Sequence, residues 1–301
     1  MNNTFYSNGK LLLTGEYVVL DGATALAIPT KYGQRLTIES SSMGELLWNS
    51  FDVNNQCWFS ASFALDTFEV LGSDNPKIAN TLQKIVREAK RLNPKFLTNT
   101  GGAHAITQLT FPRDWGLGSS STLINNIAQW AQVDAFKLLQ NSFGGSGYDI
   151  AAAQQRELFF YQLKEGQPTV QKAHLSWDFK DSLFFVHLNK KQDSKEGIAH
   201  YKSTPVSTKD IQNISDLSKK LLLCYSLNDF ENLMQSHERS ISEIIKLPTV
   251  KEKLFADFSG TVKSLGAWGG DFVLATGGET AKEYFRRKGY TTLISFDDMI
   301  L

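Results

Sequence analysis

The residue types best suited to phosphate chemistry form a glycine and serine cluster in the middle of the chain. It reads P-R-D-W-G-L-G-S-S-S over residues 112–121. The part suited to binding phosphate consists of Gly116, Leu117, Gly118, Ser119, Ser120 and Ser121. Glycines let the backbone turn tightly and approach a ligand, and a helix that starts just after them points its free N–H groups and positive dipole end at the loop. Serine hydroxyls add donors to phosphate oxygens and ligands for Mg²⁺. The pattern suits a triphosphate site without being a Walker A loop, although a loop with a serine N-cap would look the same.

Three further motifs carry residues that phosphoryl transfer uses. Asp149 follows the glycine-rich turn at 144–147 and opens a short helix, so it is either a general base, an electrostatic anchor or a simple helix cap. Lys10 follows Gly9 beside an expected strand, where it either contacts a phosphate or an aspartate or is a solvated surface residue. The stretch 266–271 reads G-A-W-G-G-D, which a tight turn between a helix and a strand would also require.

The elements around these motifs mix hairpins and helices. Residues 77–92 have apolar side chains at helical spacing, and residues 120–139 predict a long helix directly after the serines. The Asp21-Gly22 pair between two apolar runs predicts a hairpin within residues 9–30. A further helix is expected over 249–264, followed by a strand at 271–275. This mixture predicts an α+β fold rather than a doubly wound sheet.

Composition narrows the class of protein. The chain has 301 residues, and its 31 Lys plus Arg balance 31 Asp plus Glu, which does not suit a nucleic-acid partner. Its 2 cysteines, Cys57 and Cys224, are expected to be free thiols in a reducing compartment. No run of 18 apolar residues occurs, so no membrane span or membrane partner is expected. The 5 histidines lack metal-ligand spacing. We therefore expect a cytoplasmic protein without a nucleic-acid or membrane partner.

Taken in order, the motifs resemble those of the GHMP kinase family, named for galactokinase, homoserine kinase, mevalonate kinase and phosphomevalonate kinase. The order is Gly-Lys near the N-terminus, P-x-x-x-G-L-G-S-S-S, G-S-G-x-D about thirty residues later, and G-A-x-G-G near the C-terminus. The first motif, which continues to Gly15-Glu16-Tyr17, and the Gly-Gly-Asp ending at Asp271 look most like phosphomevalonate kinases. The resemblance extends from Gly9 to about Ala275.

This resemblance implies a two-domain fold. An N-terminal domain like the second domain of ribosomal protein S5 would span residues 1–180, and a ferredoxin-like domain would span 181–301. ATP with Mg²⁺ and the acceptor would bind between them. The implied reaction is transfer of the ATP γ-phosphate to phosphomevalonate or mevalonate, by a monomer or a homodimer.

The resemblance also assigns roles to single residues. Asp149 matches the catalytic aspartate, and Lys10 matches the lysine that pairs with it near the acceptor oxygen. Ser120 matches the hydroxyl that ligates Mg²⁺ in mevalonate kinases. The phosphate loop corresponds to residues 116–121. The loop that closes over the site is matched by Gly266, Gly269 and Gly270, and the substrate side by Glu16, Tyr17 and Ser146.

Two departures leave alternatives open. Leu138 stands where mevalonate kinases carry a Mg²⁺-binding glutamate, and Trp268 replaces a usual glycine, where its indole would either narrow the site or pack under the loop. One alternative is therefore an idle ATP-binding protein of the same fold, against which Asp149 and Lys10 argue. Another is an ATP-dependent decarboxylase like diphosphomevalonate decarboxylase, which release of CO₂ would identify.

Overall fold

The computed structural model describes residues 3–98, 100–192 and 194–301. By their internal contacts these residues form two compact units, each assembled from separate stretches of the chain. Unit 1 comprises Met1–Gly9, Tyr32–Arg113 and Leu117–Gln154. Unit 2 comprises Lys10–Lys31, Asp114–Gly116 and Gln155–Leu301. The chain thus passes repeatedly from one unit to the other, and a domain boundary at residue 180 stays a prediction.

The long strand β2 contributes to both units. In unit 1 its residues Gln34–Ser40 pair antiparallel with β6, and in unit 2 its residues Ala25–Ala27 pair antiparallel with β7. The sheet order is β5-β4-β3-β6-β2-β7-β8, and β1 also pairs with β2. The strand bounds are β1 Asn3–Leu12, β2 Ala25–Ser40, β3 Glu45–Phe51, β4 Cys57–Ala64, β5 Val70–Ser73, β6 Ala103–Leu109, β7 Phe159–Lys164 and β8 Gln167–Lys172.

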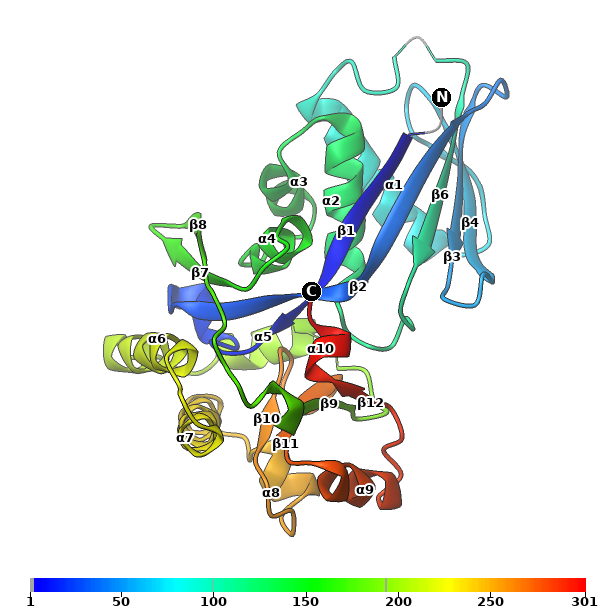
Figure 1. Cartoon of the computed structure of the whole chain (residues 1–301). Helices are drawn as coiled ribbons and strands as arrows, with labels where there is room; N and C mark the ends of the chain where they lie inside the picture. The colour runs from blue at the N-terminus through cyan, green and yellow to red at the C-terminus, as the bar shows by residue number, and fades with distance from the viewer. Residues whose placement is uncertain (1–2, 99, 193) are drawn as a thin grey trace. The chain divides into compact units, whose positions relative to one another are not determined.

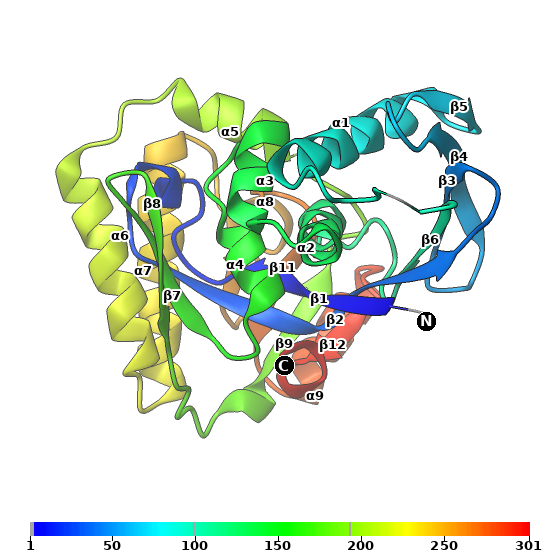
Figure 2. The same cartoon turned by 90° about the horizontal axis from the view of Figure 1, so that it is seen from above.

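Helices complete the core of unit 1. They are α1 Pro76–Leu92, α2 Ser119–Ala131, α3 Ala135–Ser142 and α4 Tyr148–Gln154. Helix α1 confirms the expected amphipathic helix: Asn75 caps its first turn, Pro76 holds the first position, and Leu82 and Val86 are buried. Figures 1 and 2 show α1 beside α2, and both helices pack against large side chains such as Trp48 of the sheet.

The helix expected over 120–139 is two helices. Helix α2 ends at Ala131, because Gln132 takes the left-handed conformation with φ 55°. Helix α3 then begins anew, with the Asp134 side chain accepting a hydrogen bond from the Lys137 amide at 3.0 Å. An aspartate is a strong N-cap, so it starts a second helix where the apolar spacing alone indicates one continuous helix.

Unit 2 is built around an antiparallel sheet in the order β10-β11-β9-β12. Along the chain the pattern is strand, helices, two strands, helix and strand, which is the ferredoxin-like arrangement expected for this region. The strands are β9 Leu183–His187, β10 Val262–Ser264, β11 Phe272–Thr276 and β12 Leu293–Ser295. The helices are α5 Ser194–Lys202, α6 Thr208–Leu222, α7 Leu227–Ile245, α8 Val250–Leu254, α9 Glu279–Arg287 and α10 Phe296–Met299, and short 3₁₀ turns lie at Val18–Asp21 and Lys180–Ser182.

Two expectations for unit 2 are wrong. Residues 9–30 do not form a hairpin at Asp21-Gly22, because Val18–Asp21 is a 3₁₀ turn whose Val18 and Val19 are buried. The helix expected over 249–264 stops at Leu254, and Val262–Ser264 pairs with β11 as a fully buried strand. In both places an apolar run is buried by tertiary packing, and such a run does not by itself distinguish strand from helix.

Two further observations concern membrane-spanning helices and the cysteines. Among the described residues, no helix has both the length and the apolar character needed to cross a membrane. Cys57 is exposed and Cys224 is buried, and both are free.

Candidate active site

The glycine and serine loop leads directly into α2. Gly116 and Gly118 have φ of 67° and 87°, a conformation that side chains other than glycine rarely adopt. Gly118 is the N-cap residue of α2, and no side chain caps the first turn. The serine N-cap that would have made this an ordinary loop is therefore not formed. The helix presents first-turn amides and its positive dipole end to the loop, as an anion site requires.

The three loop serines differ in what their hydroxyls do. Ser121 donates to the Gly118 carbonyl at 2.8 Å and so stabilises the loop itself. Ser120 is exposed and Ser119 is half-buried. Ser120 is therefore the hydroxyl with the most open access to a ligand, which fits its expected role toward Mg²⁺.

Asp149 lies in the first turn of α4, after a turn in which Gly144, Gly145 and Gly147 have positive φ. Helix α4 packs against α2, and Gln154 at its end donates to Asn125 of α2 at 2.9 Å. Unit 1 therefore fixes the helix that carries Asp149 against the helix that follows the loop. Asp149 itself is half-buried and Ser146 is buried.

Lys10 lies near the C-terminal glycine loop within unit 2. A Cβ added at Gly266 would lie 3.9 Å from the Lys10 ammonium nitrogen. The Lys10 charge also acts on Asp271: burial raises the pKa of that carboxyl, and the Lys10 charge partly opposes the shift. Lys10 and Asp149 belong to different units, so their pairing stays a prediction.

Asp271 is packed against the first glycine of the phosphate loop. A Cβ at Gly116 would lie 2.1 to 2.5 Å from the Asp271 carboxyl atoms, so only glycine fits there. The Asp271 carboxylate accepts a hydrogen bond from the Gln192 amide at 3.2 Å, and its backbone has φ 54°. The sequence placed Asp271 at the end of a motif without giving it a role.

Trp268 packs beneath the C-terminal loop. Its indole is buried and donates to the Pro248 carbonyl at 2.9 Å, and its amide donates to the Tyr17 hydroxyl at 2.9 Å. Tyr17 in turn stacks on Tyr201 with the ring centroids 5.7 Å apart. Burial raises the pKa of Tyr17, so its hydroxyl stays neutral and acts as the acceptor. Of the two placements considered for the indole, the structure therefore has the one under the loop.

Glu16 is fully buried, away from solvent. Its carboxylate pairs with Lys263, and its second oxygen lies 3.5 Å from the His237 ring. Burial raises the pKa of Glu16 to about 7 against the attraction of Lys263. Lys263 and His237 lie outside every motif of the sequence. The signal present was a lysine between Val262 and Ser264, within an apolar strand-like stretch.

The residues present fit Mg²⁺ and ATP only in part. Leu138 is a core residue with 0% exposure, so it contributes no ligand and no space for one. The described residues contain no cluster of three or more His, Cys, Asp or Glu suited to a metal ion. The uncapped α2 terminus and the exposed Ser120 hydroxyl do suit a nucleotide phosphate with its own Mg²⁺, which needs few protein ligands.

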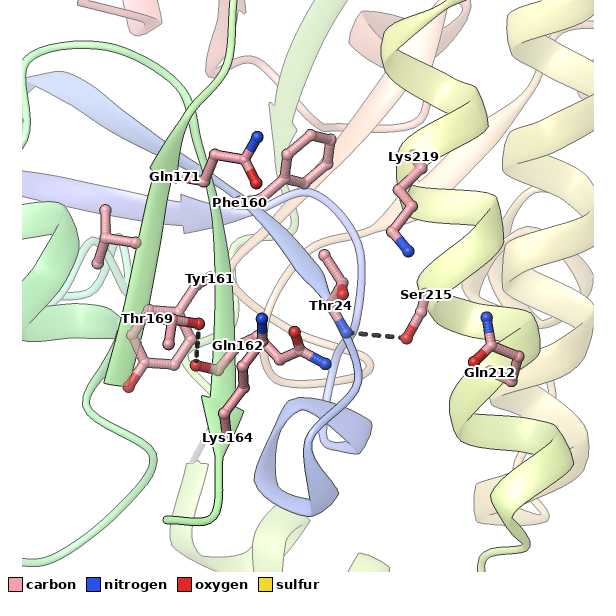
Figure 3. A pocket seen from close by; sticks show the side chains of 11 residues that line it. Thr24, Phe160, Tyr161, Gln162, Lys164, Thr169, Gln171, Gln212, Ser215 and Lys219 are labelled. Carbon is pink, nitrogen blue, oxygen red and sulfur yellow. Dashed lines mark hydrogen bonds between the residues drawn. The ribbon is translucent and has the colours of Figure 1, made fainter. Parts of the chain in front are cut away.

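A separate pocket of about 410 Å³ lies among residues of β7, β8 and α6 (Figure 3). None of the motif residues lines it. Several of its polar groups already bond within the protein: Ser215 accepts from the Thr24 amide, and Thr169 donates to the Gln162 carbonyl. The pocket therefore does not serve as the candidate site.

Comparison with solved structures matches nearly the whole chain. A mevalonate kinase crystal structure matches with a TM-score of 0.72 and 16% identity, covering 97% of this chain and 98% of that one. Streptococcus pneumoniae phosphomevalonate kinase in complex with phosphomevalonate and AMPPNP matches with 0.72 and 14%, covering 97% and 99%. Lactococcus lactis galactokinase complexed with galactose matches with 0.66 and 12%, covering 100% and 93%. Scans of the sequence against protein-family models and curated proteins gave no match. The chain therefore has the GHMP kinase fold, a mixed α+β structure with two sheets.

Proposed function

We propose that the protein is an ATP-dependent kinase that transfers the γ-phosphate of ATP to a hydroxyl of a small acceptor. The observation that carries this proposal is the glycine-led N-terminus of α2, which no side chain caps, in a chain with the GHMP kinase fold. An anion site of this kind is what a transferring phosphate needs, because phosphoryl transfer depends mainly on positioning and charge neutralisation.

Each motif residue then has one task. ATP supplies the phosphoryl group, and the first-turn amides of α2 hold its phosphate oxygens. The exposed Ser120 hydroxyl would hold Mg²⁺ on the nucleotide, and the Lys10 ammonium would offset charge on the transferring group. The Asp149 carboxylate accepts or orients the acceptor hydroxyl proton. Gly266 and Gly269, with φ of 68° and 90°, let the loop that also contains Gly270 turn tightly next to Lys10.

We infer phosphomevalonate or mevalonate as the acceptor. The support is the N-terminal motif from Gly9 to Tyr17, which resembles that of phosphomevalonate kinases. Solved mevalonate and phosphomevalonate kinases are also among the structures of the same fold. The same fold also occurs in a galactokinase and in a D-glycero-D-manno-heptose 1-phosphate kinase. Fold alone therefore does not select the acceptor.

A coupled ADP-release assay across mevalonate, phosphomevalonate, homoserine and sugars tests the proposal. We expect ADP release that requires one acceptor, and ³¹P NMR should then show one new phosphoryl group on that acceptor. Asp149→Asn is the control. Turnover with CO₂ release would identify a decarboxylase instead, and tight ATP binding without acceptor-dependent turnover would identify an idle protein.

A further inference from the structure

A group of ionisable side chains is buried in unit 2, beside the loop motifs. Lys263 of β10 pairs with Glu16, lies 3.2 Å from Glu238 Oε1 and donates to the Ser264 carbonyl at 2.6 Å. His237 and Glu238 are neighbours on α7. The side chains of all four ionisable residues, Glu16, His237, Glu238 and Lys263, are at most 4% exposed.

Hydrogen bonds link this group to the N-terminal motif that contains Gly15 and Glu16. His237 Nε2 accepts from the Gly15 amide at 3.0 Å, so that nitrogen carries no proton. Burial, aided by Lys263, holds the pKa of His237 well below its usual value, which keeps the ring neutral as this acceptor role requires. Gly15 and Glu16 are thus bonded to α7 and β10 respectively.

Tyr17, the residue after Glu16, connects this segment to the C-terminal loop. We define the closing loop as residues 265–271, which directly follow β10. The Tyr17 hydroxyl accepts from the Trp268 amide in the middle of this loop. Lys263 therefore holds the segment Gly15–Tyr17 through Glu16, and Tyr17 holds the closing loop through the Trp268 amide.

We propose that Lys263 is a positioning residue, which through Glu16 and Tyr17 sets the placement of the closing loop beside Lys10 and Gly116. An apolar cluster would fill this interior at no loss of stability. A buried lysine with two carboxylates, in contrast, accepts few alternative arrangements, because each displaced charge would remain buried without its partner.

The role in the reaction rests on the proposed function. Gly266 of the closing loop lies next to the Lys10 ammonium, and Asp271 at its end lies against Gly116 of the phosphate loop. A shift of the closing loop would move both neighbours. Loss of Lys263 should therefore lower kcat more than it weakens ATP binding.

Hydrogen exchange measured by mass spectrometry on the substrate-free protein tests the placement directly. For Lys263→Met we expect exchange about tenfold faster or more in peptides covering 14–18 and 264–271, with α1 in unit 1 unchanged. Lys288→Met is the matched control, since it removes a solvent-facing lysine 2.8 Å from Asp257 in the same unit. It should leave both peptides unchanged.

If Lys263→Met does not fold, the double variant Lys263→Met with Glu16→Gln replaces it, because one buried carboxylate is removed together with the lysine. Exchange in the two peptides that stays at the wild-type rate, or that rises equally in α1, overturns the inference. In the activity arm, kcat should fall about tenfold while KM for ATP changes less than roughly threefold. Absence of kinase activity in the wild type would refute the proposed function and leave the exchange result to decide this inference.

Discussion

Replacing Gly116 with alanine should destabilise unit 2 through two separable effects. The first is conformational: alanine at φ 67° takes a left-handed backbone that costs about 1–2 kcal/mol. The second is steric, because the new Cβ would lie 2.1 Å from Asp271 Cγ. The carboxylate must rotate away and lose its hydrogen bond from the Gln192 amide, a charge-assisted bond that contributes about 1.5–3 kcal/mol.

Gly269→Ala is the matched control, because it contains only the first effect. Gly269 has φ 90°, and an added Cβ there meets nothing within 4 Å. We therefore expect Gly269→Ala to lower the free energy of unfolding by about 1–2 kcal/mol. Gly116→Ala should lower it by about 2.5–5 kcal/mol, the sum of both effects.

Urea unfolding followed by circular dichroism measures the two values. A double-mutant cycle with Asp271→Ala isolates the clash, since removing the carboxylate leaves nothing for the new Cβ to displace. The double variant should then be more stable than the sum of the two single changes predicts, by about 1.5–3 kcal/mol. Equal losses for Gly116→Ala and Gly269→Ala, or additive effects in the cycle, would refute the assignment of Asp271 to this contact.

Three further predictions concern the reaction and its pH dependence. Asp149→Asn should lower kcat about a hundredfold or more with little change in ATP binding. Lys10→Met should have a similar effect, and the loss in the double variant should be far smaller than the sum of the two single losses. Near-normal turnover of Asp149→Asn in a steady-state assay would contradict the role of Asp149 toward the acceptor proton. Ser120→Ala should raise the Mg²⁺ concentration needed for half-maximal turnover while leaving thermal unfolding unchanged, because the side chain is exposed; an unchanged Mg²⁺ titration would count against a metal ligand here. The pKa of Glu16 is raised from 4.5 to about 7, so the folded state keeps a proton that the unfolded state releases. The Glu16 proton should therefore contribute about 3 kcal/mol to the free energy of unfolding that is lost as pH rises from about 4.5 to 7. Burial also raises the pKa of Glu238 and lowers that of His237, so Glu16→Gln should change the slope in urea titrations without flattening it. A slope identical to that of the wild type would contradict the assignment to Glu16.

The local motifs could be predicted because local chemistry defines them. Gly116 and Gly118 must be glycine where the backbone takes positive φ, and a helix directly after them creates the anion site whatever surrounds it. The helix over 77–92 is equally predictable, since its apolar spacing and the proline at its start, Pro76, are local features of the sequence.

Errors arose where an apolar run could be buried in more than one conformation. Tyr17–Leu20 reads as a strand, yet Val18–Asp21 forms a 3₁₀ turn, and Val262–Ser264 reads as the end of a helix, yet it pairs with β11. The apolar spacing continues past Asp134, so that spacing alone does not reveal Asp134 as a helix cap. For the two apolar runs the partner that decides the conformation lies outside the local window, whereas the cap at Asp134 bonds an amide only three residues away.

The sequence by itself determined the type of site: a glycine-led helix N-terminus for phosphate, with an aspartate, a lysine and a second glycine loop in a recognisable order. Only the tertiary structure decided which polar residues are buried and what they contact. Lys263 is 247 positions from Glu16, and Gly116 is also far from Asp271 in the sequence, so neither contact has a local signal. The physical reason is that burial creates these interactions: a lysine and a glutamate that would be solvated and interchangeable on a surface become specific partners once water is excluded.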